Sequence, residues 1–150
     1  SLNQVAEFHR TFNAPILETP QIPSKERCEL RVSLLQEELN ELKQAIDDYD
    51  LVEIADALCD LQYVLSGAVL EFGLGEKFVE LFNEVQRSNM SKACDTELQA
   101  QETVEHYKAK GEEAFYEKSG NKFNVHRISD NKVLKNKYYS AADLKSIIEK

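Results

Sequence analysis

The sequence predicts an all-α protein, a bundle of four to five helices with a small hairpin or arm near the C-terminus. Two observations carry this prediction. Apolar residues recur every three to four positions over much of the first 110 residues, which is the spacing of an amphipathic helix. A proline-containing connector and helix-ending glycines separate these stretches. The 150 residues can build one hydrophobic core, so we expect a single domain over residues 1–150.

The elements follow in order along the chain. Ser24 can cap a long helix, and the acidic stretch 47–50 makes the turn into a second one, which stops at Gly73. "RSNMSKACD" at 87–95 predicts a bend after the third helix. The expected helices cover residues 2–12, 25–46, 51–72, 76–85 and 97–110.

The C-terminal part changes character. Within residues 115–137, short alternation on each side of "SDNK" predicts a small hairpin or an ordered arm. "SAAD" at 140–143 has the spacing of a capping box, and a last helical turn or two should follow it.

The net charge of −9 is concentrated in the first half of the chain. Residues 1–75 hold 14 acids and 5 bases, whereas residues 76–150 hold 13 of each. We therefore expect no binding of nucleic acid or of an anionic membrane. No apolar run has the length of a membrane span. The three cysteines are far apart and predict reduced thiols in a cytoplasmic protein.

The acids fall at helical spacing on both long helices. Glu38 and Glu41 share a face of the first helix, as do Glu37 and Glu41. Glu53, Asp56 and Asp60 follow at i, i+3 and i+7 on the second helix, which is apolar almost all round and should be mostly buried.

The short turn makes the two helices pack antiparallel, so the acidic stripes could face each other. Like charges about 6 Å apart repel by roughly 3 kcal/mol at an effective dielectric near 20. Either the acids point to water as solvated faces, or a divalent cation neutralises them. Carboxylate ligands suit Mg²⁺ or Mn²⁺. A di-iron centre, an EF-hand and a Walker motif lack their required residues here.

The pattern Glu37-Glu38-x-x-Glu41 with Glu53-x-x-Asp56 resembles the all-α nucleoside triphosphate pyrophosphohydrolases, which include MazG-like proteins and phosphoribosyl-ATP pyrophosphohydrolase. "EVQRSNMSK" at 84–92 and "NKVLKNKYYSAADL" at 131–144 are similar to MazG-like segments. The resemblance implies that these five acids bind metal, with Glu37 binding a further ion or orienting water as a base, and that Glu37 and Glu38 are catalytic. It implies attack of water on the α-phosphorus of a nucleotide, which releases pyrophosphate.

The same resemblance implies substrate contacts from Arg87, Asn89 and Lys92, although these residues could equally form a helix end. Asp60 could orient a bound water, face the base or be solvated. Phe8, His9 and Asn13 could line a base pocket; alternatively Phe8 and Phe12 are core and His9 lies on the surface. A basic run could close over the phosphates or be a solvated arm: Lys118, Lys122, Arg127, Lys132, Lys135 and Lys137.

The leading hypothesis is therefore a Mg²⁺-dependent pyrophosphohydrolase that cleaves an NTP or dNTP in nucleotide house-cleaning. Two long apolar helices need partners, so we expect a homodimer or larger homo-oligomer in which subunits share the bundle. Two alternatives remain open: hydrolysis of phosphoribosyl-ATP, and a non-catalytic helical binding module on the same scaffold.

Overall fold

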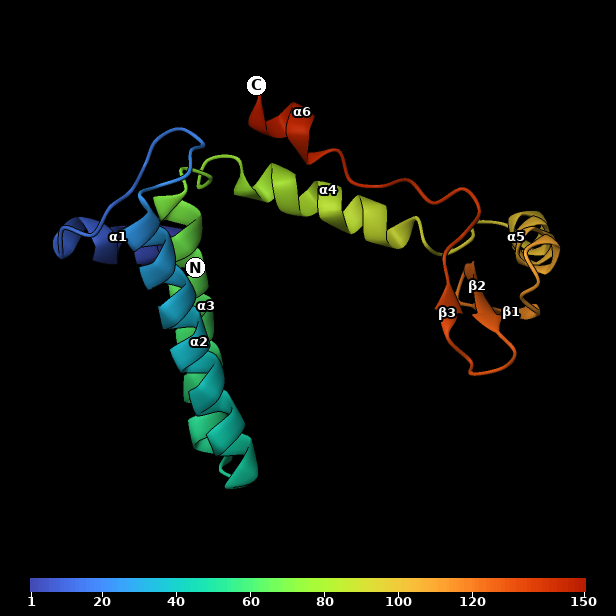
Figure 1. Cartoon of the computed structure of the whole chain (residues 1–150), viewed down its shortest axis with the longest axis horizontal. Coiled ribbons are helices and arrows are strands. Elements are labelled where there is room, and N and C mark those ends of the chain that lie inside the picture. The colour runs from blue at the N-terminus through green and yellow to red at the C-terminus, as the bar shows by residue number, and fades with distance from the viewer. The chain divides into compact units, whose positions relative to one another are not determined.

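The computed structural model describes residues 1–150, which form two compact units, residues 1–78 and 79–150. The expected helical class is confirmed in the main, because six helices make up most of the ordered structure; a three-stranded antiparallel sheet accompanies them (Figure 1). The helices are α1 Leu2–Thr11, α2 Lys25–Asp47, α3 Leu51–Glu71, α4 Phe78–Met90, α5 Glu97–Ala109 and α6 Leu144–Ile148. The strands are β1 Ala114–Ser119, β2 Lys122–Arg127 and β3 Val133–Leu134.

The first unit is dominated by a hairpin of α2 and α3, which lie side by side along their length (Figure 1). The hydroxyl of Ser24 accepts a hydrogen bond from the backbone N–H of Arg27 at 3.3 Å, which confirms the predicted cap of α2. Asp50 caps α3 in the same way, accepting from the N–H of Glu53 at 3.1 Å. The turn between them contains Tyr49 in the left-handed region at φ 54°. These two caps set the first residue of each long helix.

The proline-containing connector is bonded to the end of α3. The backbone N–H of Leu17 donates to the carbonyl of Leu70, and that of Gln21 to the carbonyl of Phe72. Gly73 ends the helix at φ 71°, and a Cβ there would lie 1.9 Å from the carbonyl oxygen of Thr19. Only glycine therefore allows the connector to approach the helix end this closely.

A buried ion cluster stabilises the end of the hairpin away from the turn. Glu71 is 1% exposed and accepts hydrogen bonds from Arg27 at 2.7 and 2.8 Å and from Arg31 at 2.7 Å. Burial alone would raise the pKa of Glu71, but the hydrogen bonds from Arg27 and Arg31 more than offset it and lower that pKa. His9 of α1 is buried beside Gly67 of α3, and this contact helps to hold α1 on the hairpin.

The second unit contains α4, α5, the sheet and α6. The strands have the order β1-β2-β3, and one side of the sheet packs on α5 around a core of Cys94, Ala100, Ala114, Val125 and Leu134. The predicted "SDNK" segment does form the connection between β2 and β3. A tighter hairpin between β1 and β2 was not predicted. Its two-residue loop has Gly120 at φ 59°, and a Gly-Asn pair between alternating strands is a hairpin signal.

The two remaining helices of the second unit differ in how well they were predicted. The third helix continues through Arg87 to Met90 instead of ending near residue 85, so the bend begins at Ser91. The last helix does follow "SAAD", as predicted, and its cap is Asp143, the final residue of that stretch, whose carboxylate accepts from the N–H of Ser146 at 3.2 Å.

Many apolar side chains of the long helices face outward in the single chain. Leu39 is 49% exposed, Leu58 51% and Leu65 44%, so the expectation that the second long helix is mostly buried is wrong for one copy of the chain. The exposed stripe on both helices is where a partner could bury apolar surface. None of the helices is long and apolar enough to cross a membrane.

Candidate functional site

Three carboxylates converge between α2 and α3. Glu38 and Glu41 come from α2 and Asp60 comes from α3, and one oxygen of each lies within 4.8 Å of the others. Glu41 is exposed, whereas Glu38 and Asp60 are partly buried in the seam. This group is referred to below as the acidic cluster.

The register of the hairpin explains why these three residues meet. Tyr49 stands at the middle of the turn, and Glu38 precedes it by as many residues as Asp60 follows it. Since both helices rise about 1.5 Å per residue, residues equidistant from the turn lie at the same level. Glu41 lies one turn from Glu38 on the same face and therefore reaches the same group.

The acidic cluster lacks a counter-charge. No lysine or arginine forms an ion pair with Glu38, Glu41 or Asp60, and one carboxylate oxygen of Glu38 is buried without a hydrogen-bond partner. Burial, followed by a hydrogen bond and repulsion from Glu41, raises the pKa of Glu38 to about 7. Burial and then the charges of Asp56 and Glu41 also raise the pKa of Asp60. Full deprotonation of the acidic cluster is therefore unfavourable without a bound cation.

These residues fit a divalent cation. A bound cation would coordinate the unpartnered oxygen of Glu38. It would also offset the repulsion between carboxylates that helps to raise the pKa of Glu38 and of Asp60. The ligands are all carboxylate oxygens, the donor set of Mg²⁺ and Mn²⁺. An exposed acidic face alone would not leave a buried, unsatisfied carboxylate oxygen.

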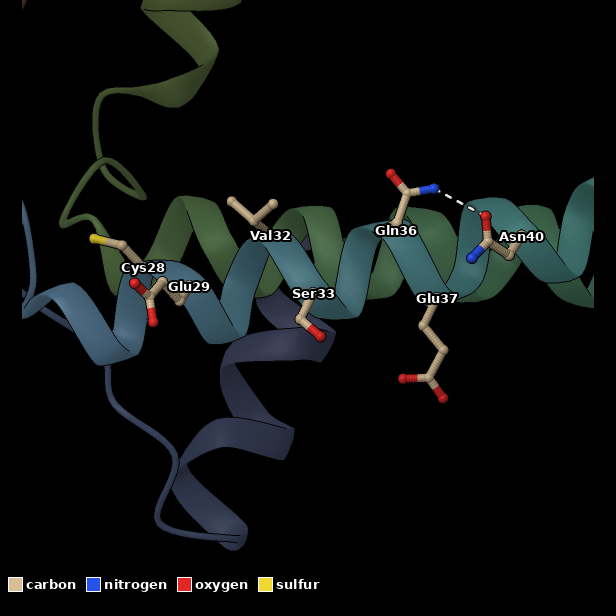
Figure 2. A pocket seen from close by; sticks show the side chains of 7 residues that line it. All are labelled: Cys28, Glu29, Val32, Ser33, Gln36, Glu37 and Asn40. Carbon is tan, nitrogen blue, oxygen red and sulfur yellow. Dashed lines mark hydrogen bonds between the residues drawn. The ribbon is translucent and has the colours of Figure 1, made fainter.

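The other predicted metal ligands lie outside the acidic cluster. Glu53 and Asp56 are exposed on α3, nearer to the turn, although Asp56 is close enough to Asp60 to raise its pKa. The carboxylate of Glu37 extends into open space beside α2 (Figure 2). Their roles as ligands, and that of Glu37 as a base, stay predictions. Sequence reasoning gave Asp60 a less direct role, and counting residues from the turn would have placed it with Glu38.

A hollow of about 660 Å³ lies on the outer face of α2 and includes Glu37. All seven of its lining side chains come from that one helix (Figure 2). One helix face does not enclose a small molecule, and none of the acidic cluster lines it. We therefore place the chemistry at the acidic cluster and interpret the hollow as part of the exposed face of α2.

An aromatic cluster lies one helical turn beyond Asp60. Tyr63 of α3 meets Phe8 edge-on with ring centroids 5.5 Å apart, and Phe8 lies 4.5 Å from Phe12. All three are substantially exposed and line a surface cavity of about 430 Å³. The alternative that Phe8 is core and His9 lies on the surface is wrong, because Phe8 is 42% exposed and His9 4%.

Asn13 lies two residues past the end of α1 with φ 57° and is exposed; its predicted role in a base pocket stays a prediction. The predicted phosphate contacts lie in the second unit. Arg87 donates to both carboxylate oxygens of Glu84, at 2.9 and 2.7 Å, and so already has an anionic partner. Asn89 is exposed in the last turn of α4, and Lys92 follows the helix. Lys135 lies 4.6 Å from the centre of the Tyr139 ring.

Comparison with known proteins gives a family match over the helical hairpin. Residues 5–89, more than half of the chain, match the sequence model described as phosphoribosyl-ATP pyrophosphohydrolase. The matched segment includes the acidic cluster and α4 up to Asn89. The chain is also 24% identical to an uncharacterized protein of Acanthamoeba polyphaga mimivirus, in an alignment that covers 97% of this chain and 94% of the viral protein.

Proposed function

Because this chain belongs to the phosphoribosyl-ATP pyrophosphohydrolase family, whose members act on phosphoric anhydride bonds, we propose that it hydrolyses a nucleoside triphosphate to the monophosphate and pyrophosphate. The observation that carries this proposal is the acidic cluster, in which Glu38, Glu41 and Asp60 meet without a counter-charge. Nucleotide house-cleaning is the role we propose for the reaction.

We assign the metal site to these three carboxylates, with Mg²⁺ as the proposed ion and Mn²⁺ as its substitute. Mg²⁺ bound there would offset the charge of the triphosphate and make a water molecule more acidic. Glu38 must give up its proton before it can bind a cation, and its raised pKa makes it the residue that couples binding to pH. Glu37, Glu53 and Asp56 remain proposed as outer or additional ligands, with Glu37 also a candidate base.

We propose that the aromatic cluster holds the base. The exposed rings of Phe8, Phe12 and Tyr63 offer apolar faces on which a base can stack, a contact worth about 1–3 kcal/mol per base in other systems. Stacking favours any base, so selection would come from polar groups at the rim such as Asn13. Asp60 stands between this surface and Glu38, since it belongs to the acidic cluster and lies one turn from Tyr63.

We also propose a homo-oligomer. The support is the row of exposed apolar side chains on α2 and α3, including Leu39, Leu58 and Leu65. Burying these side chains against a second copy would gain roughly 25 cal/mol for each Å² of apolar surface removed from water. A dimer whose α2–α3 hairpins form a shared bundle would cover this row.

A panel of nucleotides tests the reaction. Pyrophosphate release is measured from nucleoside and deoxynucleoside triphosphates and from phosphoribosyl-ATP, with Mg²⁺ and with EDTA. We expect metal-dependent release of pyrophosphate from at least one triphosphate. Turnover of phosphoribosyl-ATP alone would support the second candidate function, which the description of the matched family favours. Absence of both turnover and metal binding would support a binding module instead.

Two matched variants of α3 test the metal site. Asp60→Asn should lower kcat/KM and Mg²⁺ affinity by more than about 100-fold, since it removes a direct ligand. Asp56→Asn removes the same charge one turn earlier, from an exposed position, and should have a much smaller effect. If Asp56→Asn instead causes the larger loss, Glu53 and Asp56 are the ligands on α3 and the assignment of Asp60 is refuted.

A further inference from the structure

The turn that follows α1 is bonded to His9 twice. Asn13 is in the left-handed region at φ 57°, and the N–H of Ala14 donates to the backbone carbonyl of His9 at 2.8 Å. These two features form the Schellman ending of a helix. The side chain of His9 adds a second bond, because its Nδ1 lies 2.9 Å from the carbonyl oxygen of Pro15. A carbonyl oxygen can only accept, so Nδ1 carries a hydrogen and donates it.

The ring of His9 is buried against a fixed part of the α2–α3 hairpin. Gly67 of α3 leaves the space for the ring, since a Cβ there would lie 3.0 Å from Nε2 of His9 and 2.8 Å from Nη1 of Arg31. Arg31 is itself bonded at 2.7 Å to the buried carboxylate of Glu71. The ring therefore has a set position on the hairpin, and the turn that it bonds is set with it.

This turn carries side chains that belong to the proposed base surface. Phe12 is the residue that ends α1, its ring lies 4.5 Å from that of Phe8, and Asn13 follows it. Val5 and His9 are the two buried residues of α1. Val5 is apolar and lies one helical turn before His9, so it holds the helix on the hairpin without a bond to the turn. Of the two, His9 is the residue that determines where the turn lies.

We propose that His9 is a positioning residue for base binding: its ring fixes the turn that presents Phe12 and Asn13 to the base, and the ring itself stays buried. This inference rests on the proposed function, which assigns the base to the aromatic cluster. The imidazole acts through the donor at Nδ1 and through the space that it fills beside Gly67. Asparagine can donate from nearly the position of Nδ1, whereas leucine fills similar space without a donor. The two substitutions of His9 therefore separate the hydrogen bond from the packing.

Hydrogen exchange of the full chain, followed by mass spectrometry, tests the positioning without any ligand. His9→Leu should increase exchange in peptides that cover residues 12–17 by about tenfold, the ordinary effect of losing one hydrogen bond, and leave α2 and α3 protected. His9→Asn should keep exchange in the turn near that of the wild type. Val5→Ala is the matched control, because Val5 is buried on the same helix and does not bond the turn. It should leave exchange in the turn unchanged.

Calorimetric titration in EDTA tests the consequence for the base. The probes are the four ribonucleoside monophosphates and ribose 5-phosphate, which has no base. His9→Leu should weaken the tightest of the monophosphates about tenfold, the loss expected when one base loses its stacking contact, and should not change binding of ribose 5-phosphate. His9→Asn and Val5→Ala should bind all five probes like the wild type.

Three results would overturn the proposal: unchanged exchange of the turn in His9→Leu, an equal loss of affinity in Val5→Ala, or a wild type that binds ribose 5-phosphate as tightly as every nucleoside monophosphate. Metal-dependent release of pyrophosphate tests the proposed function separately. There His9→Leu should raise KM and keep kcat, because it disturbs binding and leaves the acidic cluster intact. A wild type that releases no pyrophosphate would refute the proposed function, whereas exchange and titration decide on His9.

Discussion

Replacing Glu38 by Gln should stabilise the metal-free protein above pH 7. The pKa of Glu38 is raised from 4.5 to about 7, first by burial and then by Glu41 and Asp60. A carboxyl with a higher pKa in the folded than in the unfolded chain binds its proton more tightly when folded. The free energy of unfolding therefore falls as pH rises from 4.5 through 7. Glutamine keeps the site neutral and avoids this loss.

The size of the effect follows from the shift. A difference between 4.5 and about 7 corresponds to at most about 3 kcal/mol, at 1.36 kcal/mol for each pKa unit. Solvent screens part of this, because the neighbouring carboxylate of Glu41 is exposed. We therefore expect Glu38→Gln to exceed the wild type by about 1–2 kcal/mol at pH 8. At pH 4 the two proteins should be equally stable.

Urea unfolding followed by circular dichroism in EDTA measures this difference at a series of pH values. Glu7→Gln is the control, because Glu7 is exposed on α1 and lies outside the acidic cluster. Addition of Mg²⁺ should stabilise the wild type and leave Glu38→Gln almost unchanged. If Glu38→Gln is no more stable than the wild type at pH 8, Glu38 is a solvated side chain and the electrostatic reasoning is wrong.

Three further changes test the rest of the first unit. Glu71→Ala should lower the free energy of unfolding by about 3–5 kcal/mol in urea titrations, since two arginines lose their buried partner; a loss below 1 kcal/mol would contradict this. Gly73→Ala should cost about 1–3 kcal/mol, seen as a lower Tm, because its Cβ would meet the carbonyl of Thr19. Leu39→Glu should reduce the mass found by light scattering, whereas Lys43→Gln on the same helix should not. An unchanged mass for Leu39→Glu would remove that side chain from the proposed interface.

Helix positions were predictable because their signals are local. Ser24 and Gly73 mark helix ends by their own hydrogen bonds and dihedral angles, and the structure places the ends within one residue of the prediction. The end of α4 was missed because no glycine or proline stops it after Val85. Its end is held partly by hydrogen bonds with residues 140–141, which are far away in sequence: Arg87 donates to the carbonyl of Ala141, and the N–H of Ser140 donates to the hydroxyl of Ser91.

The acidic cluster was predictable only in part. The sequence identified Glu38 and Glu41 by their spacing within one helix, which is also a local property. Which acid of α3 meets Glu38 across the seam depends on how the two helices are aligned, and the length of the turn sets this alignment. A tight turn centred on Tyr49 selects Asp60 in place of Asp56, a choice that spacing along α3 alone does not make.

Two acids in the seam of the hairpin have opposite surroundings, and this contrast supports cation binding at the acidic cluster. Glu71 is buried at one end of α3 with two arginines, which lower its pKa and complete its hydrogen bonds. Glu38 lies in the same seam with no lysine or arginine paired to it, an unpartnered oxygen and a raised pKa. The second arrangement costs stability, and an apolar side chain would avoid that cost. A divalent ion from solution is the partner that would make Glu38 as favourable as Glu71.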